Sequence, residues 1–449
     1  MLVFMQQNTS KSYLTKKFFK YLVPSVTAMW FFSIYTMVDG IFVGKGVGPI
    51  ALAAVNLSMP YINGVFAVSL LISVGSSTLI TFYFGKNEKE KSNEIFTLNI
   101  ILLSIIGIVL TGLSLMFIEK IAYFLGANAE TLPYVVDYLK IIILFSTFFM
   151  VAYSLEVLVK ADGFPIYSII FVTLAAITNI VLDYILVIRY NYGIKGAAFA
   201  TGASQFISCM AFLFHFLFGK SNLKFVKPKF NFSSIAKLFT IGIPEALTEL
   251  SAGFTTFVFN FAISKHIGTY GLAAFGVIMY LNNLVLMTMV GINQGMQPLI
   301  SYYNGKGNYK NIDYLLDLAL KTSISFAVLF FGISQLFPKQ LVSFFIEPSN
   351  RNAFLLSIKG LKIFSFGFLI CGFNIILSGY FTALKETTKG TVISTLRGYV
   401  LITLILFILP NIWGNFGIWI SSLVCEALTL TVALTVYTRF QTDFKDIPL

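Results

Sequence analysis

Residues 52–54 of the chain read Leu-Ala-Ala, and the same triplet recurs at residues 272–274, after a spacing of 220 residues. The register holds without a gap from the pair Lys17 and Lys237 to the pair Lys86 and Lys306. Between them lie the pairs Pro24 and Pro244, Lys45 and Lys265, Met59 and Met279, Asn63 and Asn283, Gly75 and Gly295, Tyr83 and Tyr303, and Gly85 and Gly305. The chain therefore contains a duplicated unit. In a hydrophobic protein, two fused halves are typical of transporters that move one half against the other around a central site.

The amino-acid composition is typical of a protein embedded in the lipid bilayer. Of its 449 residues, 57 % are hydrophobic and only 11 % are charged, with a mean hydropathy of +0.84. A soluble domain contains roughly 25 % charged residues, so this composition predicts a polytopic membrane protein. The net charge of +12 does not indicate nucleic acid, because the basic residues lie in short loops and lysine far outnumbers arginine. The three cysteines, Cys209, Cys371 and Cys425, fall inside apolar segments and predict no disulfide framework.

Twelve segments are long and apolar enough to cross a membrane, which takes about 20 residues each. They are roughly 18–43, 51–83, 94–117, 133–158, 165–188, 193–218, 238–263, 272–303, 314–337, 355–382, 391–410 and 415–438. The predicted fold class is an all-α polytopic membrane protein. We predict an N-terminal six-helix lobe over residues 1–218, a basic cytoplasmic linker over 219–237 and a C-terminal six-helix lobe over 238–449. Because six is an even number, both lobes run the same way, related by a pseudo-two-fold axis along the membrane normal.

Loop charge predicts the orientation. Placing the N-terminus in the cytoplasm puts most lysines of the short loops inside, among them Lys86, Lys89, Lys224 and Lys306. Both termini are then cytoplasmic. The first apolar segment is not followed by a small-residue cleavage site, so it reads as a retained helix and not as a signal peptide.

Four polar residues of the first half are predicted to meet at one depth. Asp39 lies near the outer end of the first helix, Asn179 and Asp183 share one face of the fifth, and Thr201 lies on the sixth. Counting ~1.5 Å of rise per residue places all four in the outer half of the membrane. Two carboxylates, an amide oxygen and a hydroxyl at one depth form a plausible site for a hard cation such as Na⁺, or for a proton. The alternative to a cation or proton site is a set of ordinary polar contacts between helices, which would explain a lone Asn or Thr better than two aspartates.

The second half carries different acids. Phe259 stands at the repeat position of Asp39, whereas Glu249 stands opposite Met29, with Glu245 one turn earlier. Gln294 and Gln297 lie on the next helix. A buried glutamate near mid-membrane predicts a counter-charge for a cationic substrate or a second proton site, so Glu249, Gln294 and Gln297 are candidates for a substrate cavity. A structural hydrogen bond between helices is the alternative for Glu249.

Four further residues of the apolar segments remain. Glu156 and Lys160 are spaced i and i+4 near the end of the fourth helix, which predicts a structural ion pair. Glu426 on the twelfth helix is left without an assignment. Pro24 removes a backbone hydrogen bond from the first helix and is predicted to let that helix bend.

Two stretches resemble the multidrug and toxic compound extrusion (MATE) transporters. They are Val38-Asp-Gly-Ile-Phe-Val-Gly44 followed by Leu52-Ala-Ala-Val-Asn-Leu-Ser-Met-Pro60, and Gly291-Ile-Asn-Gln-Gly-Met-Gln-Pro-Leu-Ile-Ser301 followed by Tyr-Tyr-Asn-Gly305. The resemblance covers essentially the whole chain and is closest to the bacterial branch that contains DinF-like proteins and the staphylococcal multidrug exporter. It implies an antiporter in the bacterial inner membrane, in which H⁺ or Na⁺ entry drives export of cationic amphipathic compounds.

The resemblance also bears on individual residues. It implies a first-lobe cation site at Asp39, Asn179, Asp183 and Thr201, the four residues already grouped by depth. Relatives that use acids on the seventh and tenth helices are a poorer match, because segment 355–382 contains no Asp or Glu. No cofactor is implied, and a monomer is the default expectation.

Three alternatives stay open at this stage. A flippase for lipid-linked oligosaccharides belongs to the same broader superfamily, but it would favour a cationic cavity over buried acids. A membrane-embedded enzyme would need a motif such as His-Glu-x-x-His, which is absent from the sequence, so no enzymatic activity is expected. A channel fits the duplicated arrangement and one-sided ion site less well than alternating access does.

Overall fold

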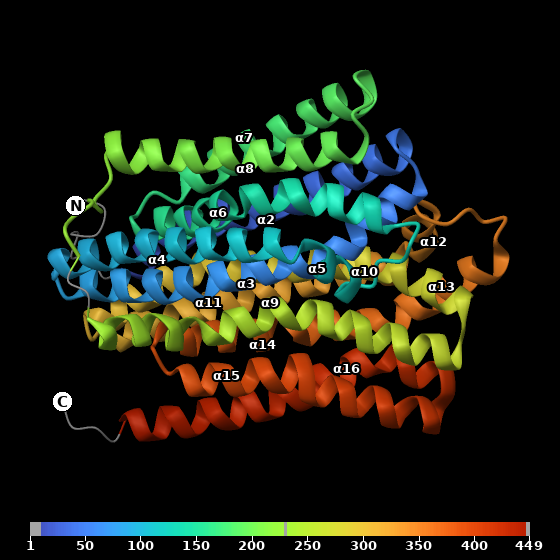
Figure 1. The fold of residues 1–449 in the computed structure, drawn as a ribbon. Helices are drawn as coiled ribbons and strands as arrows, with labels where there is room; N and C mark the ends of the chain where they lie inside the picture. The colour runs from blue at the N-terminus through green and yellow to red at the C-terminus, as the bar shows by residue number, and fades with distance from the viewer. Residues whose placement is uncertain (1–9, 229–230, 446–449) are drawn as a thin grey trace. The chain divides into compact units, whose positions relative to one another are not determined.

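The computed structural model describes residues 10–228 and 231–445, apart from the side chains of 443–445, and the described chain is built from helices (Figure 1). In the first half these are α2 (Lys11–Gly46), α3 (Pro49–Gly85), α4 (Lys89–Met116), α5 (Ile118–Phe124), α6 (Leu132–Ala161), α7 (Ile166–Asp183), the π-helical turn η1 (Tyr184–Arg189) and α8 (Gly193–Phe218). In the second half they are α9 (Phe232–His266), α10 (Thr269–Gly305), α11 (Tyr309–Leu336), α12 (Pro338–Ser343), α13 (Arg351–Phe364), η2 (Ser365–Gly367), α14 (Phe368–Ala383), α15 (Thr387–Thr395), the π-helical turn η3 (Leu396–Val400) and α16 (Leu401–Lys445).

The membrane-spanning segments agree with the prediction from sequence. Eleven helical stretches of the described chain are long and apolar enough to span a bilayer, and the last of them, Thr387–Thr442, is 56 residues long. Gly414 interrupts this last stretch with a left-handed backbone conformation (φ 57°), so the stretch supplies two passes. The described residues therefore form an all-α polytopic membrane protein with twelve spanning segments, as predicted.

Local signals in the sequence define several helix ends. Ser10 caps α2, because its hydroxyl accepts a hydrogen bond from the backbone nitrogen of Tyr13 over 3.3 Å. Pro49 opens α3 at a position where a missing N–H group costs nothing. Gly48 precedes Pro49 with a φ angle of 123°, a backbone conformation that residues other than glycine rarely adopt. These signals give α2 and α3 well-defined boundaries.

The chain forms two compact units. The first comprises the described residues up to Gly242 together with Ser301–Asn311, and the second comprises Ile243–Ile300 together with the described residues from Ile312 onward. The division into residues 1–218, 219–237 and 238–449 stays a prediction, and Lys229 and Phe230 of the predicted linker lie outside the described residues.

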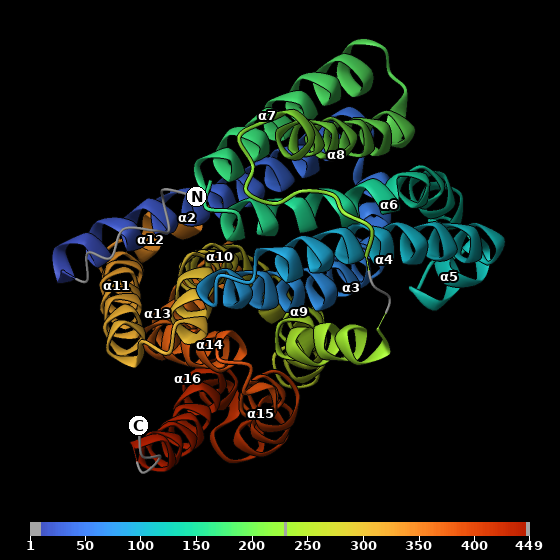
Figure 2. The ribbon, with the colours of Figure 1, turned by 90° about the vertical axis from the view of Figure 1, so that its left-hand side faces the viewer.

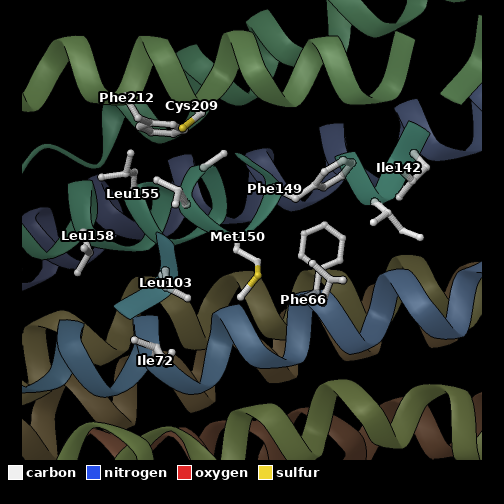
Figure 3. Close-up of a cluster of buried hydrophobic side chains, with 14 of the residues drawn as sticks. Phe66, Ile72, Leu103, Ile142, Phe149, Met150, Leu155, Leu158, Cys209 and Phe212 are labelled. Atoms are coloured by element: carbon white, nitrogen blue, oxygen red, sulfur yellow. The ribbon is translucent and has the colours of Figure 1, made fainter. Parts of the chain in front are cut away.

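The core of the first unit lies where α6 packs between α3 and α8 (Figure 3). Phe66 and Ile72 of α3 approach α6 from one side, and Cys209 and Phe212 of α8 approach it from the other. The rings of Phe66 and Phe149 meet edge to face with centroids 6.0 Å apart. In a lipid solvent such interdigitation stabilises the bundle through close packing, since lipid tails are as apolar as the side chains themselves.

A buried amide ties three helices of this core together. Asn99 of α4 donates to Ser76 Oγ of α3 over 2.9 Å and accepts from Ser154 Oγ of α6 over 2.7 Å. Gly107 lets α4 approach α6, because a Cβ atom on it would lie 2.8 Å from Thr147 Oγ1. The polar and small residues of these apolar helices thus mark the helix–helix contacts.

The segment that follows α8 is anchored to the first unit (Figure 2). The Oδ1 atom of Asp162 accepts hydrogen bonds from the backbone nitrogens of Asn222 (2.8 Å) and Leu223 (3.0 Å). The next residue, Lys224, donates its backbone N–H to Asn93 Oδ1 over 3.0 Å. Although Lys224 belongs to the predicted linker, this part of the chain packs with the first six spanning segments.

Candidate functional site

Three helices of the first unit carry the polar residues singled out by depth. Asp39 lies on α2, Asn179 and Asp183 on α7, and Thr201 on α8. Helix α7 packs against both α2 and α8, and its i, i+4 spacing turns Asn179 and Asp183 to the same buried face. All four residues are buried. Their side chains therefore lie inside the bundle and not in lipid.

The site holds more buried oxygen atoms than hydrogen-bond donors. Asn179 Nδ2 donates to Thr201 Oγ1 over 3.3 Å. Within the described residues, Asp39 Oδ1, Asn179 Oδ1 and both carboxyl oxygens of Asp183 are buried and have no hydrogen-bond partner. A buried polar atom without a partner costs about 1–3 kcal/mol, and more when it is charged. Four such oxygen atoms near one another are the kind of ligands expected at a cation-binding site.

The two aspartates also interact with each other. Their carboxyl groups lie close enough to interact electrostatically. Neither can donate a hydrogen bond while both are ionised, so two adjacent carboxylates repel unless a proton or a cation lies between them. Carboxylate, amide and hydroxyl oxygens suit a hard monovalent cation such as Na⁺. The residues present therefore fit either a proton or a sodium ion.

Two features of this site were not predicted from the sequence. The π-helical turn η1 begins directly after Asp183, and such wide turns are frequent at functional sites. Tyr138 of α6 is 1 % exposed and interacts electrostatically with both Asp39 and Asp183. Nothing in the sequence distinguishes Tyr138 from the other 21 tyrosines, because only the packing of α6 brings it to the carboxyl groups.

A cavity is lined by residues of α2, α3, α6, α7 and α8 in the same unit. Five of its thirteen lining residues are aromatic, namely Phe32, Tyr35, Phe66, Tyr153 and Phe212, and its polar lining includes the acid Glu156 and the amide Gln205. The predicted ion pair of Glu156 with Lys160 is confirmed, at 3.0 Å. The sequence did not predict that Glu156 would also line a cavity. Aromatic faces with a nearby carboxylate suit organic cations.

In the second unit, the position equivalent to Asp39 is apolar. Phe259 is 1 % exposed and stacks on Phe275 with ring centroids 4.9 Å apart. The duplicated halves therefore differ chemically at this position: the first half carries a carboxylate and the second an aromatic pair.

The glutamates of α9 have different surroundings. Glu245 Oε1 accepts hydrogen bonds from Gln297 Nε2 (2.6 Å) and Asn293 Nδ2 (3.1 Å). Glu249 is partly exposed, and Gln294 is buried. Of the predicted substrate-cavity residues, the structure thus brings Gln297 to Glu245, one turn before Glu249.

A second, smaller cavity is lined in part by Glu245. Its polar lining comes from three segments, and consists of Glu245, Thr248, Asn374, Ser378, Ser394 and Arg397. Arg397 donates from Nε to Glu426 Oε1 over 2.8 Å, and Asn374 Nδ2 donates to Glu426 Oε2 over 2.7 Å. The sequence left Glu426 without a role, because its partners lie 29 and 52 residues earlier in the chain.

This arrangement defines a class of protein: a multi-pass helical membrane protein built from two duplicated halves, one of which holds a cluster of buried oxygen atoms without hydrogen-bond partners, as in secondary transporters. The chain belongs to the MatE family, whose family model matches residues 24–185 and again residues 244–408. The two matches begin 220 residues apart, at the spacing of the internal repeat.

Known proteins are similar over nearly the whole chain. The multidrug export protein MepA of Staphylococcus aureus is 26 % identical over 432 residues, which cover 95 % of this chain and 94 % of MepA. A transporter of the MOP superfamily from Pyrococcus furiosus superimposes with a TM-score of 0.90 at 20 % identity, covering 95 % of this chain and 96 % of the other. A MATE transporter of Vibrio cholerae gives a TM-score of 0.91 at 18 % identity, covering 97 % and 99 %. The structural likeness shows that the fold is the same.

Proposed function

We propose that the protein is a secondary active exporter of cationic amphipathic compounds, driven by H⁺ or Na⁺ at Asp39, Asn179, Asp183 and Thr201. The observation that carries this proposal is the set of four buried oxygen atoms without partners on Asp39, Asn179 and Asp183. Membership of the MatE family and similarity to a multidrug export protein support the direction and the substrate class.

The coupling step follows from charge. A proton or Na⁺ that enters between Asp39 and Asp183 neutralises their repulsion and supplies the partner that the buried oxygens lack. The ion then binds one arrangement of α2, α7 and α8 better than another, which is the condition for it to shift a conformational equilibrium. Pro24 interrupts the hydrogen bonding of α2 on the way to Asp39 and supplies a point at which that helix bends. Ion binding from outside thereby favours release of the exported compound.

Aromatic and acidic side chains are proposed to contact the substrate. The cavity lined by Phe32, Tyr35 and Phe66 offers cation–π contacts, and its one carboxylate, that of Glu156, is already paired with Lys160. In the second half, Glu249, Gln294 and Gln297 remain the proposed substrate contacts, with Glu245 held beside them by Gln297. No cofactor and no catalytic step enter this mechanism.

The setting follows from composition and loop charge. We place the protein in the bacterial inner membrane as a monomer with both termini in the cytoplasm. Its partners are then the lipid bilayer and small organic cations, and nucleic acid is not among them.

Efflux of ethidium from proteoliposomes tests the proposal. A pH gradient and a Na⁺ gradient are imposed separately on wild type, Asp39→Asn and Asp183→Asn. The matched control is Asp137→Asn, an acid of the same half whose carboxylate lies 3.2 Å from Lys195 and is 41 % exposed. We expect one gradient to drive efflux in wild type and control, and neither aspartate variant to respond. Undiminished gradient-driven efflux in Asp183→Asn would move the coupling site elsewhere. No efflux from wild type under either gradient would favour the flippase alternative.

A further inference from the structure

A buried histidine faces a buried aspartate where α8 ends beside the end of α6. His215 Nε2 lies 3.5 Å from Asp162 Oδ2, and the two side chains are 4 % and 0 % exposed. This separation is longer than that of a good hydrogen bond, and neither atom has a hydrogen-bond partner among the described residues. Buried polar atoms are almost always paired, so two that face each other unpaired require an explanation beyond packing.

The other oxygen of the same carboxylate holds the segment that follows α8, residues 219–228. Asp162 Oδ1 accepts hydrogen bonds from the backbone nitrogens of Asn222 and Leu223, and the side-chain amide of Asn222 donates to the carbonyl oxygen of Asp162 over 2.8 Å. Leu223 is fully buried. One carboxylate therefore joins His215 to the path that the chain takes after α8.

The imidazole of His215 is confined by its neighbours. The rings of Tyr167 and Phe164 pack against it, with centroids 4.5 and 5.4 Å from that of the imidazole. Gly219 passes so close that a Cβ atom on it would lie 3.0 Å from His215 Nδ1. A proton taken up by this ring therefore remains in a buried environment.

The charge balance around the pair is local. In the described chain, the titratable and charged groups that face this region from α2, α6, α7 and the segment 219–228 are Tyr21, Glu156, Lys160, Tyr167, Lys220 and Lys224. Glu156 and Lys160 neutralise each other at 3.0 Å, and the two lysines of the segment are exposed. Tyrosine hydroxyls carry no charge at neutral pH. His215 is thus placed to give Asp162 Oδ2 a positively charged partner.

We propose that His215 and Asp162 form a proton-operated latch on residues 219–228. A proton on His215 turns the contact into an ion pair and supplies the partner that Asp162 Oδ2 lacks. Without that proton, Asp162 is a buried carboxylate with one unpaired oxygen, which gains solvation when the segment lifts away. Histidine exchanges its proton between about pH 5 and 8. The latch is therefore firm at the acidic end of this range and loosens toward the alkaline end.

This latch is separate from the proposed coupling site. Thr201 and His215 both lie on α8, but at ~1.5 Å of rise per residue they are about 21 Å apart along the helix axis. The latch also goes beyond the proposed function, because it acts on the chain itself and involves no exported compound.

Amide hydrogen exchange, read residue by residue on the full-length protein in detergent, tests the latch. The amide protons of Asn222 and Leu223 are the ones that Asp162 accepts, so their protection factors, which correct for the direct effect of pH on exchange, measure the latch itself. In wild type we expect protection about tenfold greater at about pH 6 than at about pH 8, corresponding to about 1.4 kcal/mol. The amide of Thr131, which donates to Asn128 Oδ1 over 2.9 Å, should be protected equally at both pH values.

Two variants assign the effect to the pair. His215→Gln keeps a polar side chain but cannot take up a proton, and Asp162→Asn keeps an oxygen acceptor but loses the charge. Both should show protection of Asn222 and Leu223 that does not change between the two pH values. His266→Gln is the matched control, since it removes the other of the two histidines in the sequence, and it should keep the wild-type difference.

Equal protection of these amides at the two pH values in wild type, or greater protection at the alkaline value, would overturn the latch. This measurement needs no substitution, so it decides the matter even if a variant fails to fold. A folded His215→Gln protein that kept the wild-type difference would overturn the latch as well. Because exchange is measured without a transported compound, the latch and the proposed function fail separately.

Discussion

The side-chain nitrogen of Asn179 donates a hydrogen bond to the hydroxyl of Thr201 over 3.3 Å, and the side-chain oxygen of Asn179 lies buried without a partner among the described residues. The bond fixes the amide so that its oxygen, and not its nitrogen, is available beside Asp183, one turn further along α7. Thr201 is therefore proposed to orient a ligand as well as to be one.

Removing the Thr201 hydroxyl should weaken coupling-ion binding. In Thr201→Val the amide of Asn179 loses its acceptor, and the concentration of the driving ion needed for half-maximal ethidium efflux should rise about fivefold, as expected from the loss of a hydrogen bond worth about 1 kcal/mol. Thr201→Ser should retain wild-type behaviour. Thr178→Val is the control on α7, because the Thr178 hydroxyl bonds only to its own helix, at Leu174. An unchanged ion requirement in Thr201→Val would remove Thr201 from the site.

If α2 bends at Pro24 during transport, replacing this proline should slow export without lowering the stability of the protein. Pro24→Ala restores a backbone hydrogen bond in the helix interior, where proline costs roughly 3 kcal/mol. The variant should unfold at the same temperature as wild type or higher, yet export ethidium more slowly. Pro60→Ala, at an exposed proline inside α3, should leave export unchanged. Equal export rates in wild type and Pro24→Ala would exclude a bending step at this residue.

The ion pair between Arg397 and Glu426 should control thermal stability. Glu426→Gln leaves the Arg397 guanidinium buried without a counter-charge, which costs about 3–5 kcal/mol, and the unfolding temperature in detergent should fall by several degrees. The double variant Arg397→Met with Glu426→Met should recover most of that loss. Lys321→Ala breaks an exposed pair with Asp317 (69 % and 49 % exposed) and should change the unfolding temperature little. A double variant as unstable as Glu426→Gln would indicate that the pair contributes more than charge compensation.

Substitution of the two glutamates of α9 should affect two different properties, thermal stability for Glu245 and substrate affinity for Glu249. Glu245→Gln loses a charge-assisted hydrogen bond with Gln297, worth about 1.5–3 kcal/mol, and should lower the unfolding temperature. Glu249→Gln should leave that temperature unchanged and raise the ethidium concentration needed for half-maximal export, because it removes only a counter-charge. Export titrations alongside thermal unfolding distinguish the two. If only Glu245→Gln weakened substrate binding, the counter-charge would be Glu245.

The sequence predicted the spanning segments and the first-half residue set, because both depend on local rules. Helix length follows from runs of apolar residues, and depth follows from counting along a helix of constant rise. Asp39, Asn179, Asp183 and Thr201 could therefore be grouped before any packing was known. The repeat in turn predicted where the halves would correspond, and the family model begins at its two equivalent prolines, Pro24 and Pro244.

Tertiary structure alone decided which side chains meet. Gln297 donates a hydrogen bond to Glu245, Arg397 pairs with Glu426, and Asn99 links Ser76 to Ser154. The contact of His215 with Asp162 is invisible to pattern analysis as well. In each case the partners are far apart in sequence, and the rotation and approach of whole helices bring them together. Periodicity determines which residues share a face of one helix, but only packing decides what that face contacts.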